Sequence, residues 1–100
     1  MKLWLDDIRE APEGWEWFTC PWKALYFVLR MDDEIDEWSL DHDLGENVPT
    51  GYDFLCMIEL LLACGLKVHV PEVSIHSDNS VGIKNMRSAL GSIAKLSQPA

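Results

Sequence analysis

The sequence of 100 residues lacks the features that mark secreted, membrane-spanning and zinc-binding proteins. Its three cysteines are odd in number and form no Cys-x-x-Cys pair, which argues against a disulfide framework and a structural zinc site. Its longest apolar run, residues 54–66, contains Glu59 and is shorter than the roughly twenty residues that a membrane span needs. The first residues include Asp6 and Asp7, where a signal peptide needs an apolar stretch. We therefore expect a cytoplasmic protein that does not bind membranes.

Basic residues are also scarce. Lys and Arg number 8 against 17 Asp and Glu, so the net charge is −9, and the excess of acid lies in the first half of the chain. The negative electrostatic potential of so acidic a chain repels a phosphate backbone. We therefore expect no general nucleic-acid binding unless bound cations make the potential locally positive. With 48% hydrophobic residues, the composition is that of a folded protein. The length fits one domain, residues 1–100.

Short apolar runs of strand type alternate with amphipathic segments of helical type along the chain. The predicted strands are residues 3–5, 15–18, 38–40 and 70–75. Alternating strands and helices are typical of a parallel sheet with helices packed on its faces. The pattern therefore predicts an α/β fold, a three-layer α/β/α sandwich around a parallel sheet of about four strands.

Three helices are predicted between and after these strands. Thr19 is expected to cap the first, which has Pro21 in its first turn. The second is opened by the capping pair Thr50 and Asp53 and ended by Gly65. The expected apolar face of the first helix is Trp22, Leu25, Tyr26 and Leu29, and that of the last is Ile83, Met86, Leu90 and Ile93.

Polar side chains follow three of the predicted strands directly: Asp6 and Asp7, then residues 41–43, then His76 and Ser77. The carboxyl ends of parallel strands lie at one edge of the sheet, where ligands bind in such folds. Each acid could instead be an ordinary turn or capping residue, since Asp is common where strands end. Taken together, the three groups favour convergence on one cleft.

Several carboxylates in one cleft repel one another, and a bound divalent cation relieves that repulsion. Oxygen ligands suit Mg²⁺ or Mn²⁺. The candidate metal ligands are Asp6, Asp7, Asp41 and Asp43.

His42 and His76 could divide the acid and base roles of phosphoester cleavage, because imidazole titrates near neutrality. Each could instead be a hydrogen-bonded structural histidine. Phosphate oxygens could be bound by Arg9, Ser77, Asn79 and Lys84, the last three lying near the start of the final helix, whose N-terminus is electropositive. Arg9 and Lys84 could equally be ordinary surface residues.

Three motifs carry a family resemblance: Leu3-Trp4-Leu5-Asp6-Asp7-x-Arg9, Ser39-Leu40-Asp41-His42-Asp43-Leu44-Gly45 and His76-Ser77-x-Asn79. Together they resemble the cyclic-phosphate processing receiver domain family. The resemblance implies a receiver-like, flavodoxin-like fold and a role in handling cyclic phosphates, such as those left on RNA ends or on ADP-ribose during RNA repair. It also implies that Asp6 and Asp7 form the metal-binding acidic pair, that Asp41 is the central acid and that Ser77 supplies the hydroxyl after the fourth strand.

The sequence departs from ordinary receivers in two places. The loop of residues 10–14 stands where receivers have their first helix, and no fifth strand with its phosphate-binding lysine is expected, since Lys95 follows a helix. These departures argue against a phosphorylation switch and favour hydrolysis.

The sequence therefore predicts a metal-dependent hydrolase, a phosphodiesterase acting on cyclic phosphates of nucleotides, RNA termini or ADP-ribose. Its predicted catalytic residues are Asp41, His42 and His76. Two alternatives stay open. One is a non-catalytic receiver-like module that binds a cyclic nucleotide or a protein partner. The other is a small acidic protein whose N-terminal half binds a basic surface.

Overall fold

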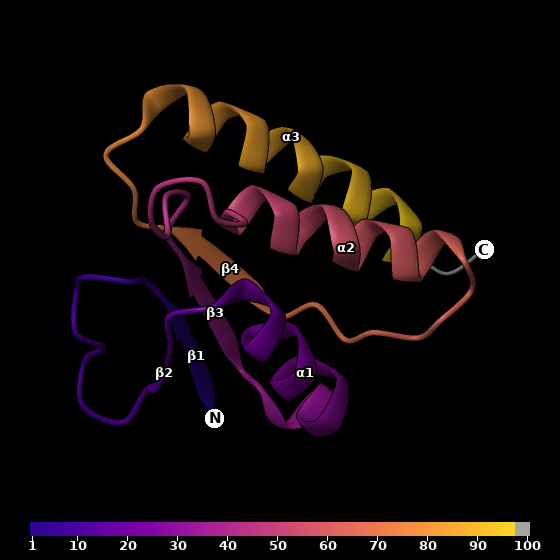
Figure 1. Cartoon of the computed structure of the whole chain (residues 1–100). Coiled ribbons are helices and arrows are strands. Elements are labelled where there is room, and N and C mark those ends of the chain that lie inside the picture. Colours follow the sequence, from indigo (N-terminus) through magenta and orange to yellow (C-terminus); the bar gives the residue numbers. More distant parts are fainter. Residues whose placement is uncertain (98–100) are drawn as a thin grey trace.

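The structure, a computed structural model, describes residues 1–97 as a single parallel sheet with helices packed on it (Figure 1). The strand order is β2-β1-β3-β4, and every neighbouring pair is parallel. The α/β class and the parallel sheet of four strands are confirmed. In chain order the elements are β1 (Lys2–Leu5), β2 (Glu16–Phe18), α1 (Pro21–Met31), the 3-10 helix η1 (Asp32–Glu34), β3 (Glu37–Leu40), α2 (Gly51–Ala63), β4 (Glu72–Ile75) and α3 (Ser80–Ser97).

All three α-helices of the described residues cover the same face of the sheet. Phe27 of α1 packs on Phe18 of β2, with ring centroids 4.9 Å apart, and Phe54 of α2 packs on Trp38 of β3 at 5.4 Å. The strand register places Phe18 and Trp38 on one face. The third helix, α3, packs along α2 on that same side (Figure 1).

The predicted three-layer arrangement is therefore wrong in one respect: residues 1–97 form two layers, with helices on one face only. The reason is topological. Crossovers between parallel strands are right-handed, and β2 lies on the opposite side of β1 from β3 and β4. The β1–β2 connection therefore passes over the other face, and this connection contains no helix. The expected loss of the first receiver helix is thus what removes the third layer.

The helix-free face carries one side chain of each strand at the same level: Trp17, Trp4, Ser39 and Ser74. The loop between β1 and β2 covers part of this face. The Trp4 indole N–H donates to the carbonyl of Arg9 at 2.9 Å within this loop. The loop covers β1 where a helix would otherwise lie. It does not cover the edge strand β2, where Trp17 is 43% exposed.

The core lies between the sheet and the helices. Side chains from β1, β3 and all three helices fill it, and the largest fully buried ones are Trp38, Phe54, Leu3, Leu5, Ile35, Leu40, Leu55, Ile58, Met86 and Ile93. No helix of the described residues has the length and hydropathy needed to cross a bilayer. Among residues 1–97 there is no fifth strand, as expected, but Lys95 lies within α3 rather than after a helix.

The predictions for α1 are wrong in two details. The residue at its N-cap is Cys20 rather than Thr19, and no side chain caps the helix. Its buried residues are Pro21, Ala24 and Val28, whereas three of the four side chains predicted to face the core are exposed. Ala24 and Val28 are small, and this face lets the helix backbone approach the sheet closely.

The predicted start and end of α2 are confirmed. Thr50 and Asp53 form a reciprocal capping box at the start of α2, and Gly65, with a φ of 92°, follows its end. Of the four residues predicted for the apolar face of α3, Met86 and Ile93 are buried in the core, whereas Ile83 and Leu90 are half-buried.

The first residue of α2, Gly51, lies so close to the backbone of Asp41 that only glycine fits. A Cβ at Gly51 would overlap the carbonyl oxygen of Asp41, whereas a Cβ at Gly91 in α3 would meet nothing within 4 Å. We expect Gly51→Ala to lower the free energy of unfolding by about 1–3 kcal/mol because the strain falls on backbone. The matched control Gly91→Ala should raise it by about 0.5–1 kcal/mol. Urea unfolding measures both, and equal effects of the two substitutions would contradict the close approach.

Candidate functional site

A cleft of about 520 Å³ opens where β1, β3 and β4 end. The residues that follow these three strands, although far apart in sequence, meet at this edge of the sheet. The cleft is lined by Asp6, Asp7, Ile8, Arg9, Asp41, Asp43, Gly45, Ser77 and Asp78.

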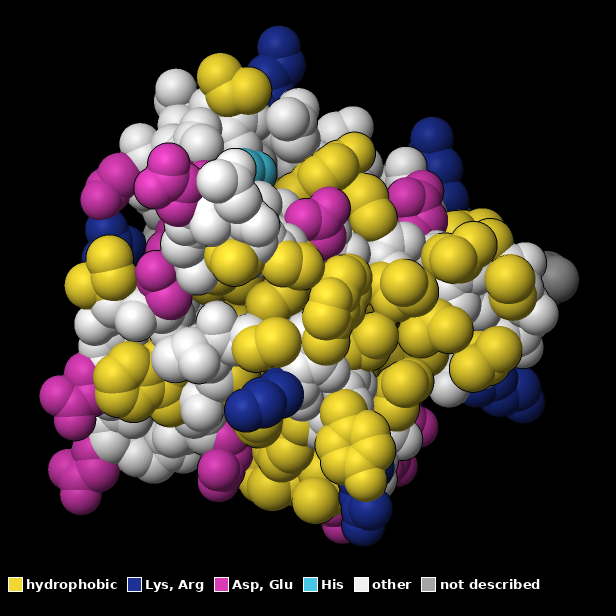
Figure 2. Space-filling model, in the orientation of Figure 1, with side chains coloured by type: hydrophobic (Ala, Val, Ile, Leu, Met, Phe, Trp, Pro, Cys, Tyr) yellow, Lys and Arg dark blue, Asp and Glu magenta, His cyan; other side chains and the backbone are white. Residues whose placement is uncertain are grey.

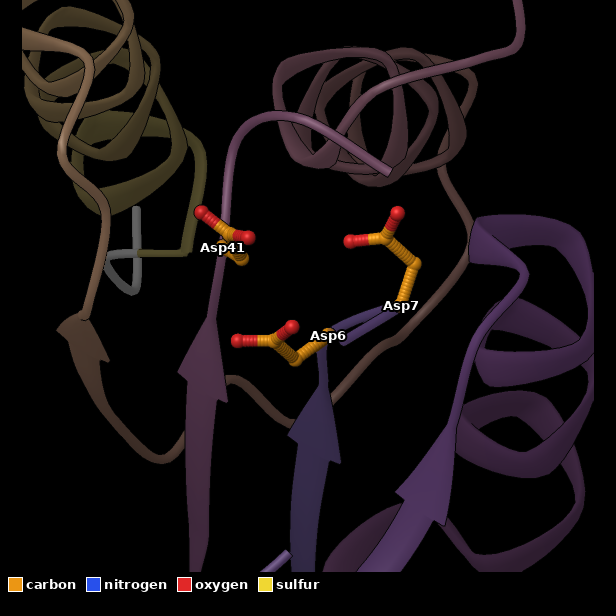
Figure 3. Close-up of side chains that lie close together, drawn as sticks. All are labelled: Asp6, Asp7 and Asp41. Atoms are coloured by element: carbon orange, nitrogen blue, oxygen red, sulfur yellow. The ribbon is translucent and has the colours of Figure 1, made fainter. Parts of the chain in front are cut away.

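Three carboxyl groups gather at the centre of the cleft. Asp6, Asp7 and Asp41 each offer an oxygen, and these oxygens lie within 4.8 Å of one another. Figure 3 shows the three side chains directed toward a common space above the ends of β1 and β3. Asp43, the fourth predicted ligand, also lines the cleft but is not part of this cluster.

Asp6 is the most enclosed of these acids, with 1% of its surface exposed. Its Oδ1 accepts the backbone N–H groups of Ile8 and Arg9, both at 2.8 Å, which closes a tight turn after β1. Its Oδ2 accepts a hydrogen bond from Nε2 of His76 at 3.0 Å. A buried carboxylate needs such partners, and here they hold its orientation.

His76 has both ring nitrogens engaged. Because Nε2 donates to Asp6, Nδ1 is the acceptor, and it receives the hydroxyl of Ser39 at 2.7 Å. The Trp4 indole stacks on the imidazole with centroids 3.8 Å apart and planes 8° apart. Burial lowers the pKa of His76 below 6.5, although the Asp6 carboxylate opposes that shift. His76 does not line the cleft; it orients Asp6, as residues behind metal ligands commonly do.

Asp41 sits in a position that disfavours its charge. Burial raises the pKa of Asp41 above 3.8, and the nearby Asp6 carboxylate adds to this effect. A hydrogen bond from Ser77 and one from the backbone N–H of His42, at 2.8 Å, act in the opposite direction. A positive charge placed among these carboxylates would therefore stabilise them.

Asp43 and His42 form a second pair at the rim. Nδ1 of His42 bonds Oδ1 of Asp43 at 2.8 Å, and this hydrogen bond lowers the pKa of Asp43 below 3.8. The His42 ring packs against Gly82 so closely that a Cβ there would lie 2.5 Å from Cγ of His42. Asn79 donates to Asp43 at 3.2 Å and accepts the backbone N–H of Gly82 at 2.9 Å. Asn79 therefore joins the rim to the start of α3.

Among protein families, the cyclic-phosphate processing receiver domain matches residues 1–92 of the chain. The chain belongs to this family. Comparison with curated proteins and with solved structures finds no match. The family assignment agrees with the parallel α/β sheet.

In this receiver domain the predicted phosphate-binding residues are dispersed. Arg9 and Ser77 line the cleft. Arg9 also bridges two loops: Nη1 donates to the carbonyl of His76 at 3.0 Å, and Nη2 pairs with Asp78. Asn79 caps α3, whereas Lys84 is exposed on α3 and does not line the cleft.

The structure also adds residues that the sequence analysis of this receiver domain missed. Asp78 occupies the unassigned position of the third motif and pairs with Arg9. Ser39 and Trp4 contact His76 from neighbouring strands. The strand alternation could have placed Ser39 and Trp4 on the helix-free face, but only the sheet register shows that they meet His76.

The donor set of the cleft suits a hard divalent cation. Asp6, Asp7 and Asp41 offer carboxylate oxygens within 4.8 Å of one another, and oxygen ligands are those that Mg²⁺ and Mn²⁺ prefer. Asp43 lies at the rim with His42 and Asn79 as partners, so three of the four predicted ligands form the cluster.

We expect Asp41→Asn to stabilise the metal-free protein at neutral pH. The folded-state pKa of Asp41 is raised, so its ionisation costs stability as the pH rises above 3.8. The increase in Tm, measured with a chelator present, should be seen at pH 7 and disappear near pH 3.

Asp43→Asn is the matched control. The pKa of Asp43 is lowered, so its carboxylate contributes stability above pH 3.8 that is lost on acidification. This variant should therefore have a lower Tm than the parent protein at pH 7. If the two substitutions changed the Tm at pH 7 in the same direction, the opposite pKa shifts of Asp41 and Asp43 would be contradicted.

Proposed function

We propose that this protein is a metal-dependent phosphoesterase that opens cyclic phosphates on nucleotides, RNA termini or ADP-ribose. The observation that carries the proposal is the cluster of Asp6, Asp7 and Asp41, whose oxygens lie within 4.8 Å in an open cleft. The family to which the chain belongs supports the cyclic-phosphate substrate class.

Asp6, Asp7 and Asp41 would hold Mg²⁺ or Mn²⁺. Such a cation supplies positive charge that offsets the charge of the phosphate oxygens and polarises the phosphoryl group. The cation would also offset the electrostatic repulsion between the acidic residues of the cleft and a bound phosphate. The positioning of Asp6 by His76 and by the turn after β1 keeps this ligand in place before a cation arrives.

The reaction is a hydrolysis. Water attacks phosphorus, one ring P–O bond breaks, the released ribose oxygen takes a proton and the product is a phosphate monoester. Arg9 and Ser77 are the residues of the cleft that can donate hydrogen bonds to phosphate oxygens. Asp43 lines the cleft and would accept the proton of the water, and its hydrogen bond to His42 at the rim would hold its carboxylate in position.

This assignment revises the expected role of His76. Both of its nitrogens are bonded within the protein, so it acts through Asp6 as a positioning residue. Of the two histidines predicted to be catalytic, His42 keeps a free Nε2 among the hydrogen bonds of the described residues.

A second candidate function is a module that binds a cyclic phosphate without turnover. The observation that favours it is that neither imidazole ring lines the cleft. The chromatography experiment described below distinguishes a protein that opens cyclic phosphates from one that only binds them.

We expect Mg²⁺ to raise the Tm of the protein, because a ligand that binds only the folded state stabilises it. The gain is about 2.7 kcal/mol at a hundredfold excess of metal over its dissociation constant. Asp41→Asn should remove most of this shift, since it replaces one of the three clustered carboxylates. Asp33→Asn, which changes an exposed acid of η1, serves as the control. A shift that persists in Asp41→Asn would contradict the site.

The activity is tested by chromatography of 2′,3′-cyclic nucleotides, short RNAs ending in cyclic phosphate, and ADP-ribose cyclic phosphate after incubation with protein and Mg²⁺ or Mn²⁺. Ring opening should require metal and fall about 100-fold or more in Asp41→Asn, as expected for loss of a group that stabilises transition-state charge. Asp33→Asn should match the parent protein. If no substrate is opened while one still raises the Tm, the binding module is the correct function.

A further inference from the structure

The side chains that line the cleft are strongly unequal in charge. Five of them are aspartates and one, Arg9, is basic, which leaves four negative charges in excess. Figure 2 shows Asp and Glu side chains concentrated on the side of the molecule where β3 and β4 end. A divalent cation on the clustered carboxylates offsets two of these charges, so the cleft stays negative even with a cation in place.

Arg9, the basic residue of the cleft, is already paired. Its Nη1 donates to the carbonyl of His76 at 3.0 Å, and its Nη2 pairs with the carboxylate of Asp78. The guanidinium can still donate a hydrogen bond to one phosphate, but its charge is matched by that of Asp78. Among the described residues that line the cleft, none therefore supplies an unmatched positive charge.

The surface beside the cleft does not reverse this sign. Two exposed acids, Glu10 and Glu46, each directly follow a residue that lines the cleft. Two lysines, Lys23 and Lys84, lie near the starts of α1 and α3, which begin at this edge of the sheet, but neither lines the cleft. These flanking charges balance one another, so the excess of acid within the cleft is left uncompensated.

The lining also lacks the side chains with which proteins bind single-stranded RNA. Such proteins combine a basic groove, which follows the backbone, with aromatic rings on which the bases stack. Within residues 1–97, the cleft is lined by no aromatic side chain and by a single basic one. An RNA strand entering the cleft would therefore bring further phosphates toward acids and would find no ring for its bases.

One large apolar side chain, that of Ile8, lies beside the carboxylates. Ile8 lines the cleft and is 81% exposed. Single exposed apolar residues are common, but the backbone of this one is held by Oδ1 of Asp6, which accepts its N–H at 2.8 Å. The side chain is thus presented at a defined place and suits contact with one base or ribose. The cleft volume of about 520 Å³ is in the range of sites for small ligands.

We propose that the cleft selects a cyclic phosphate carried by a single nucleoside over the cyclic phosphates of RNA ends and of ADP-ribose. This inference rests on the proposed function and names its substrate class. A nucleoside 2′,3′-cyclic phosphate has one negative charge, which lies at the cluster of carboxylates and its cation. The pyrophosphate of ADP-ribose adds two charges and each further nucleotide of RNA adds one. These extra charges meet the uncompensated acids and are repelled.

Calorimetric binding in the presence of Mg²⁺ tests the selection without turnover. The ligands are a nucleoside 3′-phosphate and an RNA tetranucleotide with the same 3′-phosphate, neither of which has a ring to open. The single nucleotide should bind about tenfold more tightly at low salt, because a field of one sign changes the local concentration of a charged ligand by at least this factor. The difference should shrink at high salt, which screens the repulsion.

Two double variants with the same change in net charge locate the effect. Glu10→Lys with Glu46→Lys places positive charge beside the cleft and should remove most of the preference for the single nucleotide. Asp33→Lys with Glu72→Lys is the matched control, because it changes exposed acids of η1 and of the start of β4, at the opposite edge of the sheet. This control should keep the preference of the parent protein.

Ile8→Ser tests the contact with the nucleoside. It should weaken binding of the nucleoside 3′-phosphate about fivefold, near the effect of one buried methylene group. Binding of inorganic phosphate, which has no nucleoside, should stay as in the parent protein.

The proposal is overturned if the tetranucleotide binds as tightly as the single nucleotide, or if its affinity falls as salt rises, as in proteins that bind nucleic acid. Equal effects of the two double variants, or no effect of Ile8→Ser, would also overturn it. If the order of affinities holds while no cyclic phosphate is opened, the cleft selects its ligand as proposed and the phosphoesterase function is wrong. If neither ligand binds, both proposals are wrong.

Discussion

The buried carboxylate of Asp6 is the group around which this protein is arranged. A carboxylate that is 1% exposed has to find hydrogen-bond donors inside the protein. It receives two from the turn after β1 and one from His76, which follows β4. Because His76 is bonded in turn to Ser39 of β3, a single acid links three parallel strands at the edge where the cleft opens. The acidic cluster is thereby attached to a rigid frame.

The helix-free face of the sheet explains why this frame is possible. In a sheet covered on both sides, a histidine and an indole stacked on one face would compete with a packed helix. Here the loop between β1 and β2 leaves room for the Trp4 ring to lie flat on His76. The Asp6 side chain is 1% exposed, and a hydrogen bond to such a buried group is stronger than one in water. The helix-free loop between β1 and β2 therefore has two consequences: the sheet lacks a second helix layer, and Trp4 can stack on His76.

Confining the helices to one face also limits how much apolar surface the chain can bury. Packing of α1 against the sheet uses its small side chains, so the large ones on its other side are directed to solvent. The cleft and the groove beside the outer face of α1 are lined by separate residues.

Local chemistry determined much of this protein from the sequence alone. The strand ends, the capping box of Thr50 and Asp53, and the stop at Gly65 depend on neighbours within a few residues, and each was predictable for that reason. The edge at which the acids meet followed from the parallel sheet.

Other features depended on contacts between distant segments. The buried face of α1 could not be read from periodicity, because both sides of the helix are apolar at helical spacing. The roles of His76, Asp43 and Asp78 depend on partners in other segments of the chain, 36 to 70 residues away for His76–Asp6, Asn79–Asp43 and Arg9–Asp78. The sequence thus determined which polar groups lie near the cleft. The tertiary structure decided which of them are available to a ligand, because hydrogen bonds between distant segments engage the others.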